Sequence, residues 1–299
     1  MKYNSLGKTG LQVSEISFGC MSLGTDHAAN RILLHQALDQ GITLFDTADL
    51  YQKGENEVTV GKAFKGRRSE VVIATKVGNA WRPDGSGWDW VPTNDYLLQA
   101  VEHSLRRLET DYIDLYQLHG GTLEDPIDGI IEAFELLKQQ GKIRAYGISS
   151  IRPNVIREYV QRSRIGSVMM QYSLLDRRPE ESCLDLLQDH NVAVLARGSF
   201  AQGLLVNKAA KNYLNYSEQE VAQAAAAVQQ VDATTQRSAA EVAARFVLHH
   251  PAVTSAVLGI RTEQQLSDAV QIAAASPLTS GEVEMLQQAI APNTYEQHR

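Results

Sequence analysis

Eight short apolar segments, each followed by a stretch with helical character, constrain the fold of this chain more than any other feature. The apolar segments are residues 16–18, 43–45, 71–75, 112–118, 143–148, 167–170, 192–195 and 253–258. Several are apolar without interruption, as parallel strands covered on both faces should be. Eight strand–helix units predict an α/β fold, a closed (β/α)8 TIM barrel whose functional site lies at the carboxyl ends of the strands.

Helical patterns fill the intervals between these strands. The expected helices span residues 28–40, 55–64, 94–108, 127–140, 154–161, 180–189, 218–231 and 239–249, and two more begin at Thr262 and Thr279. The last four each follow a Ser or Thr with Glu or Gln three residues later, which is a capping-box pattern. Two helices fall between the seventh and eighth strands, so we expect a long loop and helix insertion there, able to close over a ligand.

A hairpin signal precedes the first unit. Residues 3–6 and 11–13 flank Gly7-Lys8-Thr9-Gly10, with glycine where positive φ is needed. We expect this hairpin to plug the amino-terminal mouth of the barrel. The alternative fold, a doubly wound open sheet, is disfavoured because no G-x-G-x-x-G motif follows any strand. No linker-like stretch divides residues 1–299, so a single domain is expected.

Composition narrows the class of protein. Hydrophobic residues make up 43% of the chain, and its formal net charge of −7 includes no long run of one sign, which argues against a nucleic-acid binder. Cys20 and Cys183 have no spacing typical of a metal site or a disulfide framework. The sequence shows no signal peptide and no apolar stretch of the ~18 residues that a membrane span requires. A cytoplasmic protein without membrane association is therefore expected.

Four polar residues with complementary chemistry follow three consecutive expected strands. They are Asp46 and Tyr51 after the strand 43–45, Lys76 after 71–75, and His119 after 112–118. Each alone has an ordinary structural explanation, such as a turn cap, a surface aromatic, an ion-paired amine or a strand-end histidine. Because the barrel brings all four to the same mouth, we interpret them together as a catalytic group.

This group suits the reduction of a carbonyl. A phenol titrates near ~10 and holds its proton at neutral pH. A neighbouring ammonium stabilises the phenolate and eases proton donation, while a buried ammonium itself needs an anion, which Asp46 supplies. An imidazole can hydrogen-bond the carbonyl oxygen and orient it toward the phenol. The residues thus predict acid-assisted carbonyl reduction with an external source of hydride.

These residues and their flanking motifs resemble the aldo-keto reductases, a family of NADPH-dependent barrel oxidoreductases, over essentially the whole chain. The matching motifs are Leu6-Gly-Lys-Thr-Gly-Leu-Gln-Val-Ser14, Asp46-Thr-Ala-Asp-Leu-Tyr51, Ala74-Thr-Lys76, Leu108-Glu-Thr-Asp-Tyr-Ile-Asp-Leu-Tyr-Gln-Leu-His119 and Gly141-Lys-Ile-Arg144. The resemblance implies that Asp46, Tyr51, Lys76 and His119 form the catalytic tetrad, with Tyr51 as the proton donor.

The resemblance also implies a set of residues that bind NADPH or NADP+. Ser149 and Gln171 would hold the nicotinamide carboxamide, Arg197 would stack on the nicotinamide, and the segment after it would pass over the pyrophosphate. The full expected set is Ser149, Gln171, Arg197, Gly198, Phe200, Gly203, Leu204, Gly259, Arg261, Thr262 and Gln265. Ser150 and Ala269 stand where the family more often has asparagine. The start of the helix at Thr262, reinforced by Arg261, would take the adenosine phosphate.

The substrate pocket is expected to include Met21, Trp81, Trp88 and Trp90, and the partner to be a small-molecule carbonyl compound. Trp88 and Trp90 occupy a long loop after the third strand, where they would either wall an apolar site or pack locally. Glycines after His119 would leave room near the imidazole.

Other functions remain open on the sequence alone. A regulatory or binding subunit on the same scaffold is one alternative, and the complete tetrad argues against it. A Schiff-base aldolase using Lys76 is another. A metal hydrolase is weaker, since no His-x-His pair follows any strand and no metal site is expected.

Overall fold

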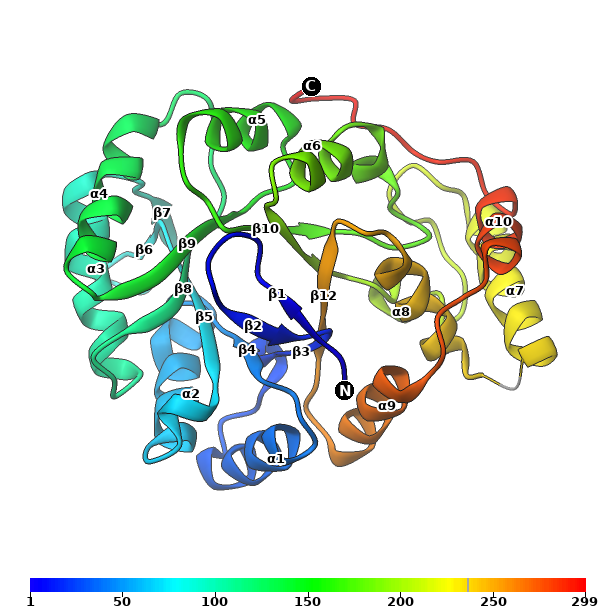
Figure 1. Ribbon diagram of the computed structural model, residues 1–299, viewed down its shortest axis with the longest axis horizontal. Coiled ribbons are helices and arrows are strands. Elements are labelled where there is room, and N and C mark those ends of the chain that lie inside the picture. The colour runs from blue at the N-terminus through cyan, green and yellow to red at the C-terminus, as the bar shows by residue number, and fades with distance from the viewer. Residues whose placement is uncertain (236) are drawn as a thin grey trace.

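A closed barrel of eight parallel strands forms the centre of the protein in the computed structural model, which describes residues 1–235 and 237–299, with side chains described outside 232–236 (Figure 1). Its strands are β3 (Ile16–Gly19), β4 (Leu44–Asp46), β5 (Val72–Val77), β8 (Ile113–Leu118), β9 (Ile143–Ser149), β10 (Ser167–Gln171), β11 (Ala193–Arg197) and β12 (Val253–Gly259). The last strand, β12, pairs with β3 and closes the ring. The predicted barrel is confirmed.

Helices surround the barrel on its outside (Figure 1). They are α1 (His27–Asp39), α2 (Glu55–Phe64), α3 (Asn94–Arg107), α4 (Ile127–Gln139), α5 (Pro153–Arg162), α6 (Cys183–Asp189), α7 (Glu218–Thr235), α8 (Ala239–His249), α9 (Glu263–Ala274) and α10 (Ser280–Gln288). Both α7 and α8 lie between β11 and β12, so the structure contains the insertion that the sequence predicted. Within residues 1–235 and 237–299, no helix combines the length and the apolar character needed to cross a membrane.

Two apolar layers hold the fold together. The outer layer joins the strands to the helices. Within it, the ring of Phe45 stacks on Phe18 and contacts Phe64 at a tilt. The inner layer fills the barrel with smaller side chains from alternate strand positions, among them Leu44, Leu115, Leu195 and Ala74. Because both faces of every strand are buried, the strand sequences are apolar without a break.

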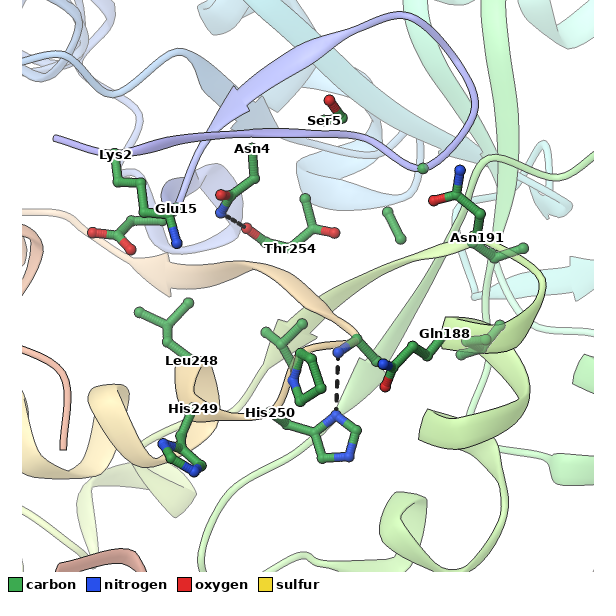
Figure 2. A pocket seen from close by; sticks show the side chains of 17 residues that line it. Lys2, Asn4, Ser5, Glu15, Gln188, Asn191, Leu248, His249, His250 and Thr254 are labelled. Atoms are coloured by element: carbon green, nitrogen blue, oxygen red, sulfur yellow. Dashed lines mark hydrogen bonds between the residues drawn. The ribbon is translucent and has the colours of Figure 1, made fainter. Parts of the chain in front are cut away.

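The N-terminal hairpin, β1 (Tyr3–Ser5) and β2 (Gln12–Ser14), closes the amino-terminal end of the barrel, as predicted. Leu6 and Val13 are fully buried against the inner layer. Gly7, at φ +53°, lies so close to the loops before β10 and β11 that a Cβ would stand 2.5 Å from the carbonyl oxygen of Gly166. Asn4 Nδ2 donates to the Thr254 carbonyl over 2.8 Å, which ties the hairpin to β12 (Figure 2).

Two local features differ from the sequence prediction. The loop after β5 contains an antiparallel ribbon of β6 (Asn79–Trp81) and β7 (Trp88–Trp90) that was not expected. The expected helix 180–189 is a 3-10 turn, Arg178–Glu181, followed by the short α6, and Ser182 breaks the helix at φ −162°. The reason is that the Glu180 carboxylate accepts hydrogen bonds from Tyr172 and Arg177, which fix the turn.

Candidate active site

A cleft of about 850 Å³ opens at the carboxyl ends of the barrel strands, and all four predicted catalytic residues line it. Asp46 ends β4, Lys76 lies near the end of β5, and His119 directly follows β8. Because these strands are neighbours in the barrel, their ends deliver the three side chains to one place. The prediction that Lys76 follows its strand is slightly off, since β5 extends through it to Val77.

The ammonium group of Lys76 is the centre of this arrangement. Its Nζ lies 2.7 Å from Asp46 Oδ2, 2.8 Å from the Thr47 carbonyl and 3.2 Å from the Tyr51 hydroxyl. The Lys76 side chain is 1% exposed, so these three partners replace water around its charge. The arrangement fixes a buried cation directly against a phenol.

Charge and burial set the protonation of Lys76 and Tyr51. Burial opposes the charge on Lys76, but Asp46 and Tyr51 together outweigh it and raise the pKa of Lys76, which therefore stays cationic. Burial raises the pKa of Tyr51, and Lys76 only partly opposes this effect. Tyr51 therefore holds its proton at neutral pH, beside a cation that stabilises the phenolate once the proton leaves.

The His119 imidazole stands edge-on to the Tyr51 ring, with ring centroids 5.9 Å apart. Burial, reinforced by the positive charges of Lys76 and Arg197, lowers the pKa of His119 to about 3. The imidazole is therefore neutral at physiological pH and has one N–H to donate. Its buried Nδ1 has no hydrogen-bond partner among the described residues, so the ring is not committed to a structural contact through that atom.

An unusual turn places Tyr51 in the cleft. Gln52 and Lys53 have φ of +51° and +57°, and Gly54 follows at φ +92° before α2 begins. Left-handed conformations cost non-glycine residues roughly 1–2 kcal/mol each, and such strain is characteristic of functional loops. Gln52 Nε2 donates to the Leu23 carbonyl over 2.7 Å and helps to hold this turn.

Part of the expected cofactor set lines the same cleft. Ser149, Arg197, Gly198 and Gly259 face it from the ends of β9, β11 and β12. Gln171, at the end of β10, accepts a hydrogen bond from Arg197 Nη1 over 3.3 Å. A hydroxyl, an amide and a guanidinium on three adjacent strands offer the donors and acceptors that a carboxamide ring requires, so these residues fit a nicotinamide.

The remaining expected cofactor residues lie in two other places. Phe200, Gly203 and Leu204 belong to the turns after β11, where Leu204 is buried. Arg261, Thr262 and Gln265 lie at the amino-terminal end of α9, where Thr262 Oγ1 accepts from the backbone N–H of Gln265.

The second capping contact at α9 differs from the expected box. Gln265 Oε1 accepts from the backbone N–H of Arg261 over 2.9 Å. The side chain of Arg261 is exposed to solvent at this helix start. The site thus combines a helix amino terminus with an accessible guanidinium, which suits a phosphate group.

Met21, Trp88 and Trp90 line the cleft, but Trp81 does not. Trp81 instead lines a neighbouring cavity of about 280 Å³, next to Asp49. The ammonium of Lys53 lies 5.2 Å from the centre of its ring, and this cation–π contact holds the indole there. The expectation that Trp81 belongs to the substrate pocket is corrected accordingly.

Trp90 is a fixed wall of the cleft. Its Nε1 donates to Asp125 Oδ1 over 2.9 Å. Gly78, at φ +126°, lies beneath the ring, where a Cβ would stand 2.5 Å from a ring carbon. Gly120 faces the same ring, with a Cβ position 3.4 Å away. The glycine after His119 therefore makes room for Trp90 rather than leaving an empty space.

Arg152 and Tyr213 are among the residues of the site that were not singled out in the sequence. Arg152, in the loop between β9 and α5, lines the cleft. Tyr213 accepts a hydrogen bond from Gln171 Nε2 over 2.8 Å, although it lies 42 residues further along the chain. Neither follows a strand directly, and the only signal for Arg152 was its place before Pro153 at the start of a helix.

A second cleft, of about 390 Å³, lies at the opposite end of the barrel, between the hairpin and the segments before β11 and β12 (Figure 2). Its polar side chains include Lys2, Asn4, Glu15 and His250. Glu15 pairs with the buried Arg245, and His250 Nδ1 accepts from the Ala252 amide. Because sites in this architecture lie at the carboxyl ends of the strands, we assign the chemistry to the cleft around Tyr51.

Comparison with known proteins agrees with this geometry. Residues 15–291 match the model of the "Aldo/keto reductase family". The oxidoreductase YqkF of Bacillus subtilis is 47% identical over 308 residues, covering 100% of both chains. The NADH-specific methylglyoxal reductase of Escherichia coli is 33% identical over 234 residues, covering 72% of each.

Solved structures give the same result. The holo form of aldo-keto reductase AKR11C1 from Bacillus halodurans superimposes with a TM-score of 0.95 at 50% identity, covering 100% of this chain and 99% of that one. Its apo form gives a TM-score of 0.86 with the same coverage. The chain belongs to the aldo-keto reductase family, and it is an oxidoreductase. Members of this family use a nicotinamide cofactor.

Proposed function

We propose that this protein is an NADPH-dependent reductase that converts aldehydes and ketones to alcohols, with Tyr51 as the proton donor. One observation carries the proposal: Lys76 Nζ lies within hydrogen-bonding distance of both Asp46 Oδ2 and the Tyr51 hydroxyl, which itself lines the cleft. A phenol held against a buried ammonium is suited to donating a proton to an oxygen on which negative charge develops.

The residues of the chain divide the work as follows. A bound nicotinamide supplies the hydride, and Ser149, Gln171 and Arg197 would hold its ring at the strand ends. The neutral His119 donates a hydrogen bond to the carbonyl oxygen and orients it toward Tyr51. Tyr51 then donates its proton to that oxygen, and Lys76 stabilises the phenolate that remains.

Asp46 acts through Lys76. Without a carboxylate 2.7 Å away, a lysine side chain with 1% exposure would lose its proton to escape the cost of burial. A neutral amine would no longer stabilise the phenolate. Asp46 therefore maintains the charge on which proton donation by Tyr51 depends.

The preference for NADPH is part of the same proposal. Family membership leaves the choice open, because the name of the relative from Escherichia coli says that it is NADH-specific. The exposed guanidinium of Arg261 beside the amino terminus of α9 favours a ligand with a further phosphate.

The direct test follows NADPH absorbance at 340 nm with a panel of aldehydes, ketones and diones. Turnover that depends on Tyr51 supports the reductase. Absence of turnover with the whole panel, while NADPH still binds, would favour a binding or regulatory role. Borohydride trapping of a carbonyl compound on Lys76 would favour the aldolase; the buried contact of Lys76 with Asp46 argues against it, because a Schiff base needs a free, uncharged amine.

A further inference from the structure

The charges that line the catalytic cleft are unbalanced. Its charged lining residues in the described chain are Asp46, Lys76, Arg152 and Arg197, one carboxylate against three cations. The protein as a whole has a formal net charge of −7. The cleft is therefore a positive site on an acidic protein, a distribution that attracts anionic ligands.

The two arginines occupy different sides of the cleft. Arg197 ends β11 and donates to Gln171, among the residues expected around the nicotinamide. Arg152 belongs to the loop after β9, and its Nη1 donates to the carbonyl of Gly121 over 2.5 Å. Gly121 lies two residues after His119, so Arg152 is anchored on the loop that also carries the imidazole.

Arg152 makes no close ion pair, although the carboxylate of Glu124 is near enough to interact with it electrostatically. Its side chain is half-buried, and no described residue places a carboxylate within 4.0 Å of it, whereas Lys76 has Asp46. The single contact to Gly121 leaves other guanidinium N–H groups to donate. A half-buried charge of this kind has lost part of its hydration, and an anionic ligand can replace the missing contacts.

We propose that the cleft accepts carbonyl compounds that also carry a carboxylate, and that Arg152 binds this carboxylate. The inference rests on the reductase function proposed above. With the carbonyl at Tyr51 and His119, the apolar part of the substrate lies along Trp90 and the anionic end lies at Arg152. Semialdehydes of dicarboxylic acids and carboxylated aromatic aldehydes have this form.

The physical basis is the geometry of the guanidinium group. Its planar N–H groups match the two oxygens of a carboxylate, and the match is poor for a neutral ester or amide. Trp88, Trp90 and Met21 line the same cleft and offer apolar surface to the rest of such a substrate. A charge-assisted contact of this kind typically gives the carboxylate compound a roughly ten- to hundredfold preference over a neutral analogue.

The experiment compares three aldehydes of matched shape: 4-carboxybenzaldehyde, its methyl ester and unsubstituted benzaldehyde. The variants are Arg152→Met, Arg152→Lys and, as a matched control for the lost charge, Arg106→Met on the exposed side of α3. Wild-type kcat/KM should favour the acid over the ester by about tenfold or more. Arg152→Met should abolish that preference by lowering kcat/KM for the acid and not for the other two aldehydes. Arg152→Lys should keep part of the preference. Arg106→Met should leave all three kcat/KM values unchanged.

Three results would overturn the proposal. Equal kcat/KM for acid and ester in the wild type would show that the enzyme has no preference for a substrate with a carboxylate. Equal losses for all three aldehydes in Arg152→Met would mean that the arginine only supports the Gly121 loop. Weaker binding of NADPH by Arg152→Met, measured by calorimetry, would assign the residue to the cofactor.

Failure of the reductase function would be recognisable separately. If no aldehyde is turned over, calorimetry with 4-carbamoylbenzoate and terephthalamide still tests the site, because these compounds need only to bind. Arg152→Met should then weaken the binding of the carboxylate compound and leave the binding of the diamide unchanged. Equal binding of both compounds by the wild type would reject the role of Arg152.

Discussion

Lys76 Nζ lies 2.7 Å from Asp46 Oδ2, and the two side chains are only 1% and 6% exposed. An ion pair at such depth gains its favourable energy from mutual neutralisation, since neither charge is hydrated. Removing one partner leaves the other buried and unpaired, which costs far more than removing both. The pair on which the proposed mechanism depends is therefore also a determinant of stability.

Lys76→Met should abolish reduction and lower the free energy of unfolding by about 3–5 kcal/mol. The double variant Asp46→Asn/Lys76→Met should be equally inactive but recover much of that stability, because no unpaired charge remains. Denaturant unfolding of the wild type and both variants measures the difference. Equal stability of the single and double variants would contradict the buried-pair interpretation.

Tyr51→Phe should lower kcat by ~10²–10⁴-fold, the usual contribution of a general acid, and leave NADPH affinity nearly unchanged. The ring remains in place, and only the transferable proton is lost. Tyr146→Phe is the matched control, because its hydroxyl donates to Glu135 at the outer layer, away from the cleft. Near-wild-type turnover by Tyr51→Phe would assign the proton to another group.

His119 should contribute a pH dependence to stability. Its pKa falls from about 6.5 in the unfolded chain to about 3 in the folded protein. Between these values only the unfolded chain binds the proton, so the contribution to stability is complete above about pH 6.5 and declines as the pH falls toward 3, by about 1.4 kcal/mol per unit. The variant His119→Asn should show a shallower decline over this range in unfolding experiments.

Activity tests the same protonation state. Because the imidazole is already neutral at pH 5, kcat/KM should show no inflection from His119 between pH 5 and 8. An inflection near 6.5 that disappears in His119→Asn would show that the histidine titrates in that range.

The cofactor preference should depend on Arg261. NADPH should exceed NADH in kcat/KM by roughly ten- to hundredfold, the contribution of one charge-assisted phosphate contact. Arg261→Ala should remove most of this difference by weakening NADPH, with little effect on NADH or on kcat at saturation. Steady-state kinetics with both dinucleotides is the measurement, and equal losses for both would indicate a role in the fold.

Binding of NADPH should protect residues 200–208 from hydrogen exchange. This segment consists of turns in which Ala201 and Gln202 have positive φ, and it follows Gly198, which lines the cleft. Residues 213–216 should change less, because Tyr213 and Tyr216 are buried and Tyr216 donates to the Ala291 carbonyl. Exchange that is identical with and without NADPH over residues 200–208 would reject closure over the cofactor.

The barrel was predictable because a strand that is buried on both faces has a sequence that is apolar without interruption. Predicting where Asp46 and Lys76 meet needed only the order of the strands. Trp81 was misplaced because a short ribbon turns its indole toward Lys53, and strands of three residues are too short to show a periodicity.

Contacts between loops that lie far apart in the sequence could not be predicted either. Arg152 enters the cleft through a bond to Gly121, 31 positions earlier, and Gln171 meets Tyr213 from the insertion after β11. Such pairs depend on the completed tertiary structure and follow no local pattern. The break at Ser182 has the same origin, since the partners of Glu180 fix the preceding turn.

The N-terminal hairpin has a consequence for the order of folding during synthesis. Asn4 bonds to Thr254, 250 positions away, and Glu15 pairs with Arg245, 230 positions away. The hairpin residues therefore wait for the eighth barrel strand before they are buried, since contacts so distant in sequence form late. Until then Leu6 and Val13 stay exposed, so a nascent chain truncated before β12 should recruit holdase chaperones through its hairpin.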